Sequence, residues 1–162
     1  MFLRGCAAHL RTPILIALYT GQRRKDVVHM TWKQFQGDIV RVRQSKTSAL
    51  LDIACHTELR KHLDGLKRRG VVICTTAAGK AFTENSLSQA LRTAVAATEG
   101  MPANRSMHGL RYAAGSRMEE AGCTVAEIES VLGHQTFKMA LKYASQRLRA
   151  KAAMQKMEAV EA

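Results

Sequence analysis

The hydrophobic pattern of the first thirty residues predicts two helices. Residues 8–19, which include an apolar run over 13–19, are typical of a mostly buried helix, and Thr20-Gly21 ends it. Residues 24–30 carry apolar side chains at helical spacing and predict a shorter second helix. Apolar residues thus dominate the start of the chain, and we expect this part to lie in the core.

A change of period marks the next segment as a small antiparallel sheet. Ile39–Arg43 alternates between apolar and polar residues and is rich in β-branched side chains, as strands are. Leu50–Ala54 predicts a second strand, and Trp32–Phe35 predicts another that leads into the turn at Gly37-Asp38. A polar turn over residues 44–48 joins the last two strands. These segments predict three strands.

The remainder of the chain has helical spacing, with caps and glycines that separate the helices. We expect helices over residues 57–69, 84–98, the segment from His108 to Gly122, 124–132, the segment that Thr136 caps, and 145–160. No repeat or linker divides the chain, so we expect one α+β, mainly helical domain over residues 1–162, with 145–162 as a C-terminal tail.

Composition excludes several classes of protein. No apolar run approaches the roughly 20 residues of a membrane span, and the N-terminus lacks a signal-peptide layout, so we expect a cytoplasmic protein. The four cysteines never form a C-x-x-C pair, which argues against a zinc site and a disulfide framework. No phosphate-binding glycine loop or carboxylate cluster appears, and we expect no cofactor or metal.

Charge points to a polyanionic partner. The chain has 25 Lys and Arg against 13 Asp and Glu, a formal net charge of +12. A surplus of this size on a small domain favours nucleic acid. Aromatic residues make up only 5%, which argues against base stacking on single strands and favours contact with a duplex backbone.

Several short motifs carry residues suited to phosphoryl transfer. His108 and Arg111 stand three residues apart, so one helix face can present both. Each motif alone also has an ordinary structural interpretation, such as an ion pair or a solvated lysine. In chain order they are Thr20-Gly21-x-Arg23-x-x-Asp26, Lys46 in a turn between strands, His108-x-x-Arg111, Leu132-Gly133-His134 and Tyr143.

Over residues 10–150 this ordered set strongly resembles the catalytic domain of the tyrosine recombinase (phage integrase) family. The resemblance implies a DNA strand transferase that cleaves and rejoins DNA through a 3′-phosphotyrosine. It assigns the nucleophile to Tyr143, the phosphate clamp to Arg23 and Arg111, and the general acid to Lys46. It further implies that His108 assists proton removal from the tyrosine, that His134 hydrogen-bonds the phosphate and that Asp26 supports the site.

The chain departs from the family pattern in three respects. Gln22 stands where the family often has an apolar residue, and Asp26 stands where it usually has Glu. The N-terminal core-binding domain of intact family members is absent from these residues. The resemblance also implies self-association on DNA through the tail after Tyr143.

Two other functions remain open at this point. A type IB topoisomerase shares the tyrosine chemistry. A non-catalytic DNA-binding module, or a decayed integrase, would use only the basic surface. The sequence leaves open the target site, the direction of the reaction, the host element and the oligomeric state.

Overall fold

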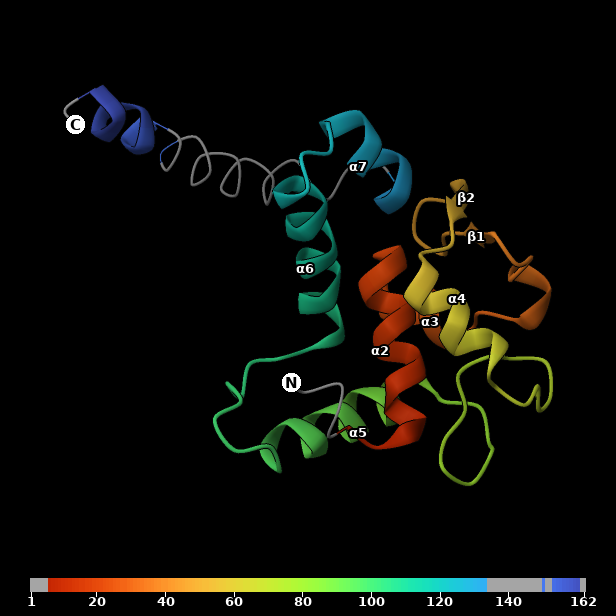
Figure 1. Cartoon of the computed structure of the whole chain (residues 1–162). Helices are drawn as coiled ribbons and strands as arrows, with labels where there is room; N and C mark the ends of the chain where they lie inside the picture. Colours follow the sequence, from red (N-terminus) through yellow and green to blue (C-terminus); the bar gives the residue numbers. More distant parts are fainter. Residues whose placement is uncertain (1–5, 134–149, 151–152, 161–162) are drawn as a thin grey trace.

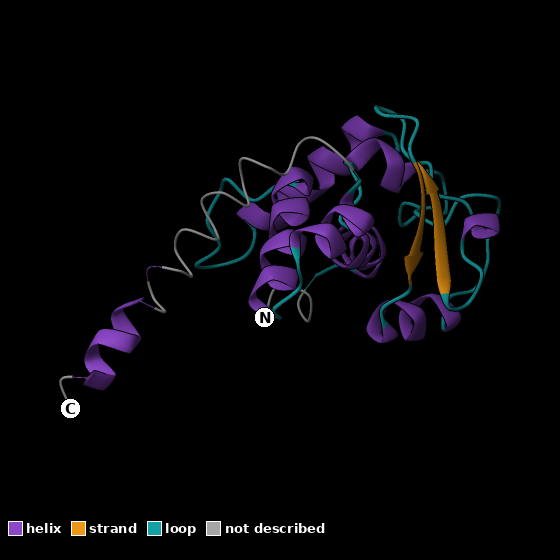
Figure 2. Ribbon diagram, turned by 90° about the horizontal axis from the view of Figure 1, so that it is seen from above, coloured by secondary structure: helices purple, strands orange, loops and turns teal. Residues whose placement is uncertain are grey.

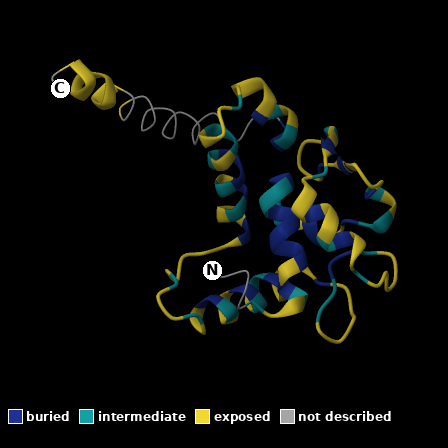
Figure 3. Cartoon of the chain, viewed as in Figure 1, coloured by how far each residue is buried: buried dark blue, intermediate teal, exposed yellow. Residues whose placement is uncertain are grey.

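A long buried helix, α2 (Ala8–Thr20), runs through the middle of the fold (Figure 1). The structure, a computed structural model, describes residues 6–133, 150 and 153–160. Most of α2 is buried because its residues are largely apolar, as Figure 3 shows, so the predicted helix over 8–19 is confirmed. Within the described residues no helix, α2 included, is long and apolar enough to cross a membrane.

Four other helices contact α2 and cover it. They are α3 (Arg24–Val28), α4 (Thr57–Asp64), α5 (Glu84–Ala96) and α6 (Met107–Glu120). The chain leaves α2 through Gly21, whose φ of 63° is the left-handed conformation that glycine adopts without strain. This sharp exit places Arg23 directly before α3.

The sheet lies at one side of the helices (Figure 2) and consists of β1 (Ile39–Arg43) and β2 (Leu50–Ala54). The strands are antiparallel, and their register pairs Ile39 with Ala54 and Arg43 with Leu50. Val40 and Val42 are buried on the inner face, in agreement with the alternating pattern of the sequence. Both predicted strands are confirmed.

The prediction of a third strand over Trp32–Phe35 is wrong. The segment forms a 3₁₀ helix, η1 (Trp32–Gln34), which is closed by reciprocal contacts between Thr31 and Gln34. Phe35 makes an isolated bridge to Val40 and no extended pairing in the described part of the chain. A short aromatic segment fits either conformation, and here the capping contacts favour the helix.

The helical predictions hold best where a cap is clear. Helix α7 (Val125–Leu132) begins at the predicted capping box, in which Thr124 and Glu127 bond reciprocally. Helix α4 instead ends at Asp64, short of the predicted Arg69, and Gly65 follows it. Basic helix formers after Gly65 made that end difficult to locate from sequence.

Two clusters of apolar side chains form the core. The larger one joins α2, α3, α4, α5 and the sheet. The smaller one, Ala114, Ile128 and Leu132, fastens α7 to α6. Through this second cluster the end of α7 is brought against the end of α2, where the candidate site lies.

Candidate active site

Arg111 is the most deeply buried charged group among the predicted site residues that the structure describes. It lies in the second turn of α6, a helix that Ser106 caps by accepting a hydrogen bond from the Gly109 N–H. Only 4% of Arg111 is exposed. Its Nη1 donates to the Gly21 carbonyl at 2.7 Å and its Nη2 to the Leu132 carbonyl at 2.8 Å. These bonds fix the guanidinium between the ends of α2 and α7.

Arg23 approaches the same place from the start of α3. It is the residue preceding that helix, and its Nη1 donates to the side-chain oxygen Oε1 of Gln44 at 3.1 Å. Arg23 is only partly buried, so part of it remains accessible to a ligand. The two arginines therefore reach one region from segments far apart in the sequence.

The two arginines are neighbours, because Arg23 binds Gln44, and Gln44 and Arg111 donate to the same Leu132 carbonyl. Burial first and the charge of Arg23 second lower the pKa of Arg111 to about 10, against the opposite effects of Asp26 and Tyr112. A group with this pKa is still protonated at neutral pH. Two like charges are thus held near each other, an arrangement that an anion between them would stabilise.

Asp26 anchors the turn that carries Lys46. Its Oδ1 accepts a hydrogen bond from the Ser45 N–H at 2.8 Å, and the residue is only 8% exposed. The other oxygen, Oδ2, is buried and has no hydrogen-bond partner in the described part of the chain. Lys46 itself is exposed, directly after the anchored residue. Asp26 therefore connects α3 with the turn between β1 and β2.

Arg23, Lys46 and His108 line one cavity of about 470 Å³. Its other walls come from α3, α5 and the start of α6, including Arg24, Lys25, Glu84, Ser88 and Ser106. Arg111 does not line this cavity but is buried beside Arg23. The ring of His108 meets Tyr112 edge-on, with centroids 4.7 Å apart. Three predicted site residues thus share one basic hollow.

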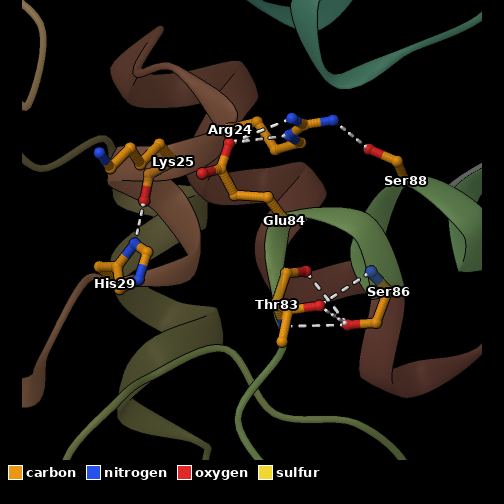
Figure 4. A network of polar contacts seen from close by, with 7 residues as sticks. All are labelled: Arg24, Lys25, His29, Thr83, Glu84, Ser86 and Ser88. Carbon is orange, nitrogen blue, oxygen red and sulfur yellow. Dashed lines mark hydrogen bonds and ion pairs between the residues drawn. The ribbon is translucent and has the colours of Figure 1, made fainter.

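The rim of the cavity holds an organised ion pair, drawn in Figure 4. Arg24 donates from Nε and Nη2 to one oxygen of Glu84, at 3.2 and 3.1 Å, and from Nη1 to Ser88 at 2.7 Å. Glu84 opens α5 after Thr83, whose hydroxyl accepts from the Ser86 N–H. A second cavity of about 690 Å³ shares Arg24 and Ser88 with the first.

Two predicted site residues, His134 and Tyr143, lie outside the described residues. His134 directly follows Gly133, and the carbonyl before that glycine is the one that Arg111 binds. The described residue Leu132, two positions before His134 in the sequence, is therefore already in contact with Arg111.

Two buried glutamines join these parts, and the sequence analysis gave neither of them a role, although it named Gln22 as a departure from the family pattern. Gln22 is 0% exposed and Gln44 is 1% exposed, and Gln44 Nε2 donates to Gln22 Oε1 at 2.8 Å. One signal was present in the sequence. Gln44 continues the alternation of Val40 and Val42. The pattern therefore places this polar side chain on the inner face, at a buried position.

Nothing in the described residues supplies a metal centre. No group of three or more His, Cys, Asp or Glu side chains that could hold an ion occurs among them. The positive charges that converge at the site come from arginine and lysine.

A comparison with known families agrees with this geometry. The model of the phage integrase family matches residues 4–149, nearly the whole chain. The chain belongs to the phage integrase family. No curated protein matches the sequence closely enough to count as a relative.

Solved structures of this family share the fold. The lambda integrase catalytic core aligns over 78% of this chain and 80% of its own, with 26% identity and a TM-score of 0.63. A lambda integrase dimer bound to a COC′ core site aligns over 85% of this chain with 22% identity and a TM-score of 0.69. XerA recombinase aligns over 89% with 16% identity and a TM-score of 0.69.

The chain spans only part of the length of the longer solved relatives. It covers 54% of the lambda integrase chain in that dimer and 58% of the XerA chain. The shared fold is the mainly helical catalytic-domain fold of tyrosine recombinases, here with a two-stranded sheet in the described residues.

Proposed function

We propose that this chain is the catalytic domain of a site-specific DNA recombinase or integrase. The observation that carries the proposal is the convergence of Arg23, Lys46 and His108 on one cavity, with buried Arg111 joined to Arg23 through Gln44 and the Leu132 carbonyl. Membership of the phage integrase family and the +12 charge support a DNA substrate. A DNA substrate also fits the expected cytoplasmic location.

In the proposed reaction the hydroxyl of Tyr143 attacks a phosphodiester. The bond from phosphorus to the 5′-oxygen breaks while a 3′-phosphotyrosine forms. The tyrosine proton passes toward His108, and Lys46 donates a proton to the leaving oxygen. Rejoining reverses these transfers, so the bond energy is retained without ATP.

The arginines would stabilise the charge that develops on phosphorus. Two fixed guanidinium groups can donate several hydrogen bonds to the non-bridging oxygens of a pentacoordinate transition state. Charges preorganised in this way need no rearrangement during the reaction and commonly contribute several kcal/mol to catalysis. His134 would add a further hydrogen bond to the same phosphate, and Asp26 would hold the turn of Lys46 in place.

We further propose that residues 1–162 form one catalytic domain whose tail, 145–162, mediates self-association on DNA. The described residues 153–160 are helical and exposed, and Met154, Met157 and Val160 present apolar surface. Lambda integrase has been solved as a dimer on a core site and as a tetramer on a Holliday junction, which supports assembly on DNA.

A nicked suicide duplex tests the activity. Because the short fragment between the scissile phosphate and the nick leaves with the 5′-hydroxyl and diffuses away, cleavage should trap a covalent protein–DNA adduct that survives denaturation. The adduct should disappear in Tyr143→Phe and persist in Tyr112→Phe, a control that removes an exposed hydroxyl beside His108.

The substrate must contain a target site. Plasmids with random inserts, presented to the protein and captured through the covalent adduct, would supply one. Salt-dependent DNA binding without any adduct, unchanged in Tyr143→Phe, would support a non-catalytic DNA-binding module instead. Catalytic relaxation of plasmid without a specific site would support a type IB topoisomerase.

A further inference from the structure

Gln44 directly follows β1, and its buried side chain has all its hydrogen-bonding capacity in use. Its Oε1 accepts from Arg23 Nη1 at 3.1 Å and from Thr47 Oγ1 at 2.8 Å. Its Nε2 donates to Gln22 Oε1 at 2.8 Å and to the Leu132 carbonyl at 2.7 Å. A glutamine amide offers two lone pairs and two N–H groups, so these four bonds saturate it.

The orientation of this amide is determined by its neighbours. Arg23 has only donors, so the atom that faces it must be the oxygen. The Leu132 carbonyl has only acceptor capacity, so the atom that faces it must be the nitrogen. Reversing the amide would break both contacts and leave buried groups unpaired, which costs about 1–3 kcal/mol for each group.

Gln22 extends the network to the preceding carbonyl of α7. Its Nε2 donates to the Thr20 carbonyl at 2.8 Å and to the Val131 carbonyl at 3.0 Å. The last carbonyls of a helix have no partner within the helix. Here Gln22 satisfies Val131, while Gln44 and Arg111 together satisfy Leu132. The amide pair thereby fixes the end of α7.

The chain leaving α7 passes tightly over the same amide. Gly133 has a φ of 74°, and a Cβ built there would lie 2.6 Å from Gln44 Oε1. Arg23, the turn of Lys46 through Thr47, and the exit toward His134 therefore all adjoin one side chain. A displacement of Gln44 would therefore change the position of all three parts.

We propose that the Gln22–Gln44 amide pair is the positioning device of the active site. It holds Arg23 and the Lys46 turn at fixed places relative to Arg111 and the end of α7, and it touches no substrate itself. This inference rests on the proposed function for its kinetic consequence. Its structural consequence can be measured without any catalysis.

The kinetic test uses Gln44→Ala with single-turnover cleavage of the suicide duplex at saturating protein. The cleavage rate should fall roughly 10- to 100-fold, as expected for misplaced catalytic groups. The dissociation constant for DNA should change less than about threefold, because phosphate contacts on the rest of the basic surface remain. Gln36→Ala, which removes an exposed glutamine, should leave both values unchanged.

A neutral scissile group separates positioning from general damage. A methylphosphonate lacks one charged non-bridging oxygen, so the reaction depends less on the placement of Arg23. The ratio of parent to Gln44→Ala rates should therefore shrink on this substrate. Equal ratios on both substrates, or an unimpaired Gln44→Ala, would overturn the proposal while leaving the proposed function intact.

Hydrogen exchange tests the device even if the parent protein cleaves no DNA, a result that would count against the proposed function alone. In Gln44→Ala the Gly133 N–H, bonded to the Glu129 carbonyl at 2.8 Å, should exchange faster. The Leu87 N–H in α5, bonded to Thr83, should keep its protection. Unchanged exchange at Gly133, or faster exchange throughout the fold, would overturn the positioning role.

A second variant covers the case in which Gln44→Ala does not fold. Gln22→Leu replaces the amide with an apolar side chain of similar size, and so removes one acceptor of Gln44 and the donor to Val131. It should accelerate exchange at Gly133 and lower the cleavage rate in the same direction by a smaller factor. Parent-like exchange and cleavage in this variant would overturn the proposal.

Discussion

Gly21 lies so close to Leu132 that a Cβ at position 21 would stand 2.0 Å from the Cδ2 of that leucine. This contact brings the end of α2 against the end of α7. Arg111 spans the same junction, since it binds the carbonyls of both residues. This close packing of Gly21 against Leu132 therefore lies directly beside the candidate site.

Gly21→Ala should destabilise the fold by roughly 2–5 kcal/mol. The left-handed backbone costs a non-glycine residue about 1–2 kcal/mol, and overpacking against Leu132 adds about 1–3 kcal/mol. Urea unfolding would measure the loss. Gly79→Ala is the matched control, because Gly79 also has a positive φ but nothing within 4 Å of an added Cβ. Equal losses in the two variants would contradict the packing argument.

Arg111→Ala should reduce cleavage by about 10²–10³-fold, the usual effect of removing one preorganised donor to a transition state. It should also lower stability by about 1–3 kcal/mol, because the buried Gly21 carbonyl loses the bond that Arg111 gives it. Single-turnover kinetics and denaturation measure the two effects. Arg41→Ala, which removes an exposed cation paired with Asp52, should alter neither by much. Parent-like cleavage by Arg111→Ala would remove the arginine from the clamp.

Lys46→Ala should be rescued by a substrate with a 5′-bridging sulfur. A thiolate leaves without protonation, so a missing general acid matters little on that substrate. Arg23→Ala should show no such rescue, because its assigned contact is with a non-bridging oxygen. Cleavage rates on the oxygen and sulfur substrates give the comparison. A Lys46→Ala variant that is equally slow on both would lose the general acid role.

Glu84→Gln should strengthen non-specific DNA binding. The change removes the negative charge that holds Arg24 at the rim of the cavity (Figure 4) and leaves the cation free to meet phosphate. The plot of log affinity against log salt should steepen by about one unit. Stability should change by less than about 1 kcal/mol, since both side chains are partly exposed.

A charge-matched variant serves as the control for Glu84→Gln. Asp52→Asn removes an equal charge from the exposed pair with Arg41 on the sheet. If it steepens the salt dependence as much as Glu84→Gln does, net charge alone would explain the effect and the rim would have no special part.

Cys74 should make stability fall in alkaline solution. Burial raises the pKa of its thiol to about 12, so the folded protein keeps a proton that an unfolded thiol loses near pH 9. Folding then takes up a proton, and its contribution to stability is complete below pH 9 and lost as the pH rises to about 12. The slope due to this one group is at most about 1.4 kcal/mol per pH unit.

Denaturation between pH 8 and about pH 10.5 would measure that loss. The decline should be smaller in Cys74→Ala than in the parent, whereas Cys123→Ala, which removes a half-buried thiol, serves as the control. Parallel curves for the parent and Cys74→Ala would contradict the burial argument.

Most of the framework could be predicted from sequence because its signals are local. The alternation of β1 predicted that strand to the residue, the segment Leu50–Ala54 was predicted as β2 with the same bounds, and the capping box predicted the start of α7. The segment Trp32–Phe35 lacked a decisive period, and its 3₁₀ helix depends on a contact between Thr31 and Gln34. Local pattern alone could not choose between the two conformations.

The candidate site was predictable only in part, for a different reason. The resemblance to a family supplied Arg23, Lys46, His108 and Arg111, whose roles stay predictions. It could not supply Gln44, because that role depends on partners 21 and 88 residues away along the chain. No periodicity records such contacts. The polar residue at an inward-facing strand position was the single hint.

Folding itself fixes the orientation of the Arg111 side chain. A guanidinium carries five N–H groups, and two of those on Arg111 bind backbone carbonyls, so three remain for other acceptors. The rotational freedom of this long side chain is lost when the chain folds and not when DNA arrives. An incoming phosphate would therefore meet a rigid socket, and binding would immobilise the nucleic acid rather than the protein at this point.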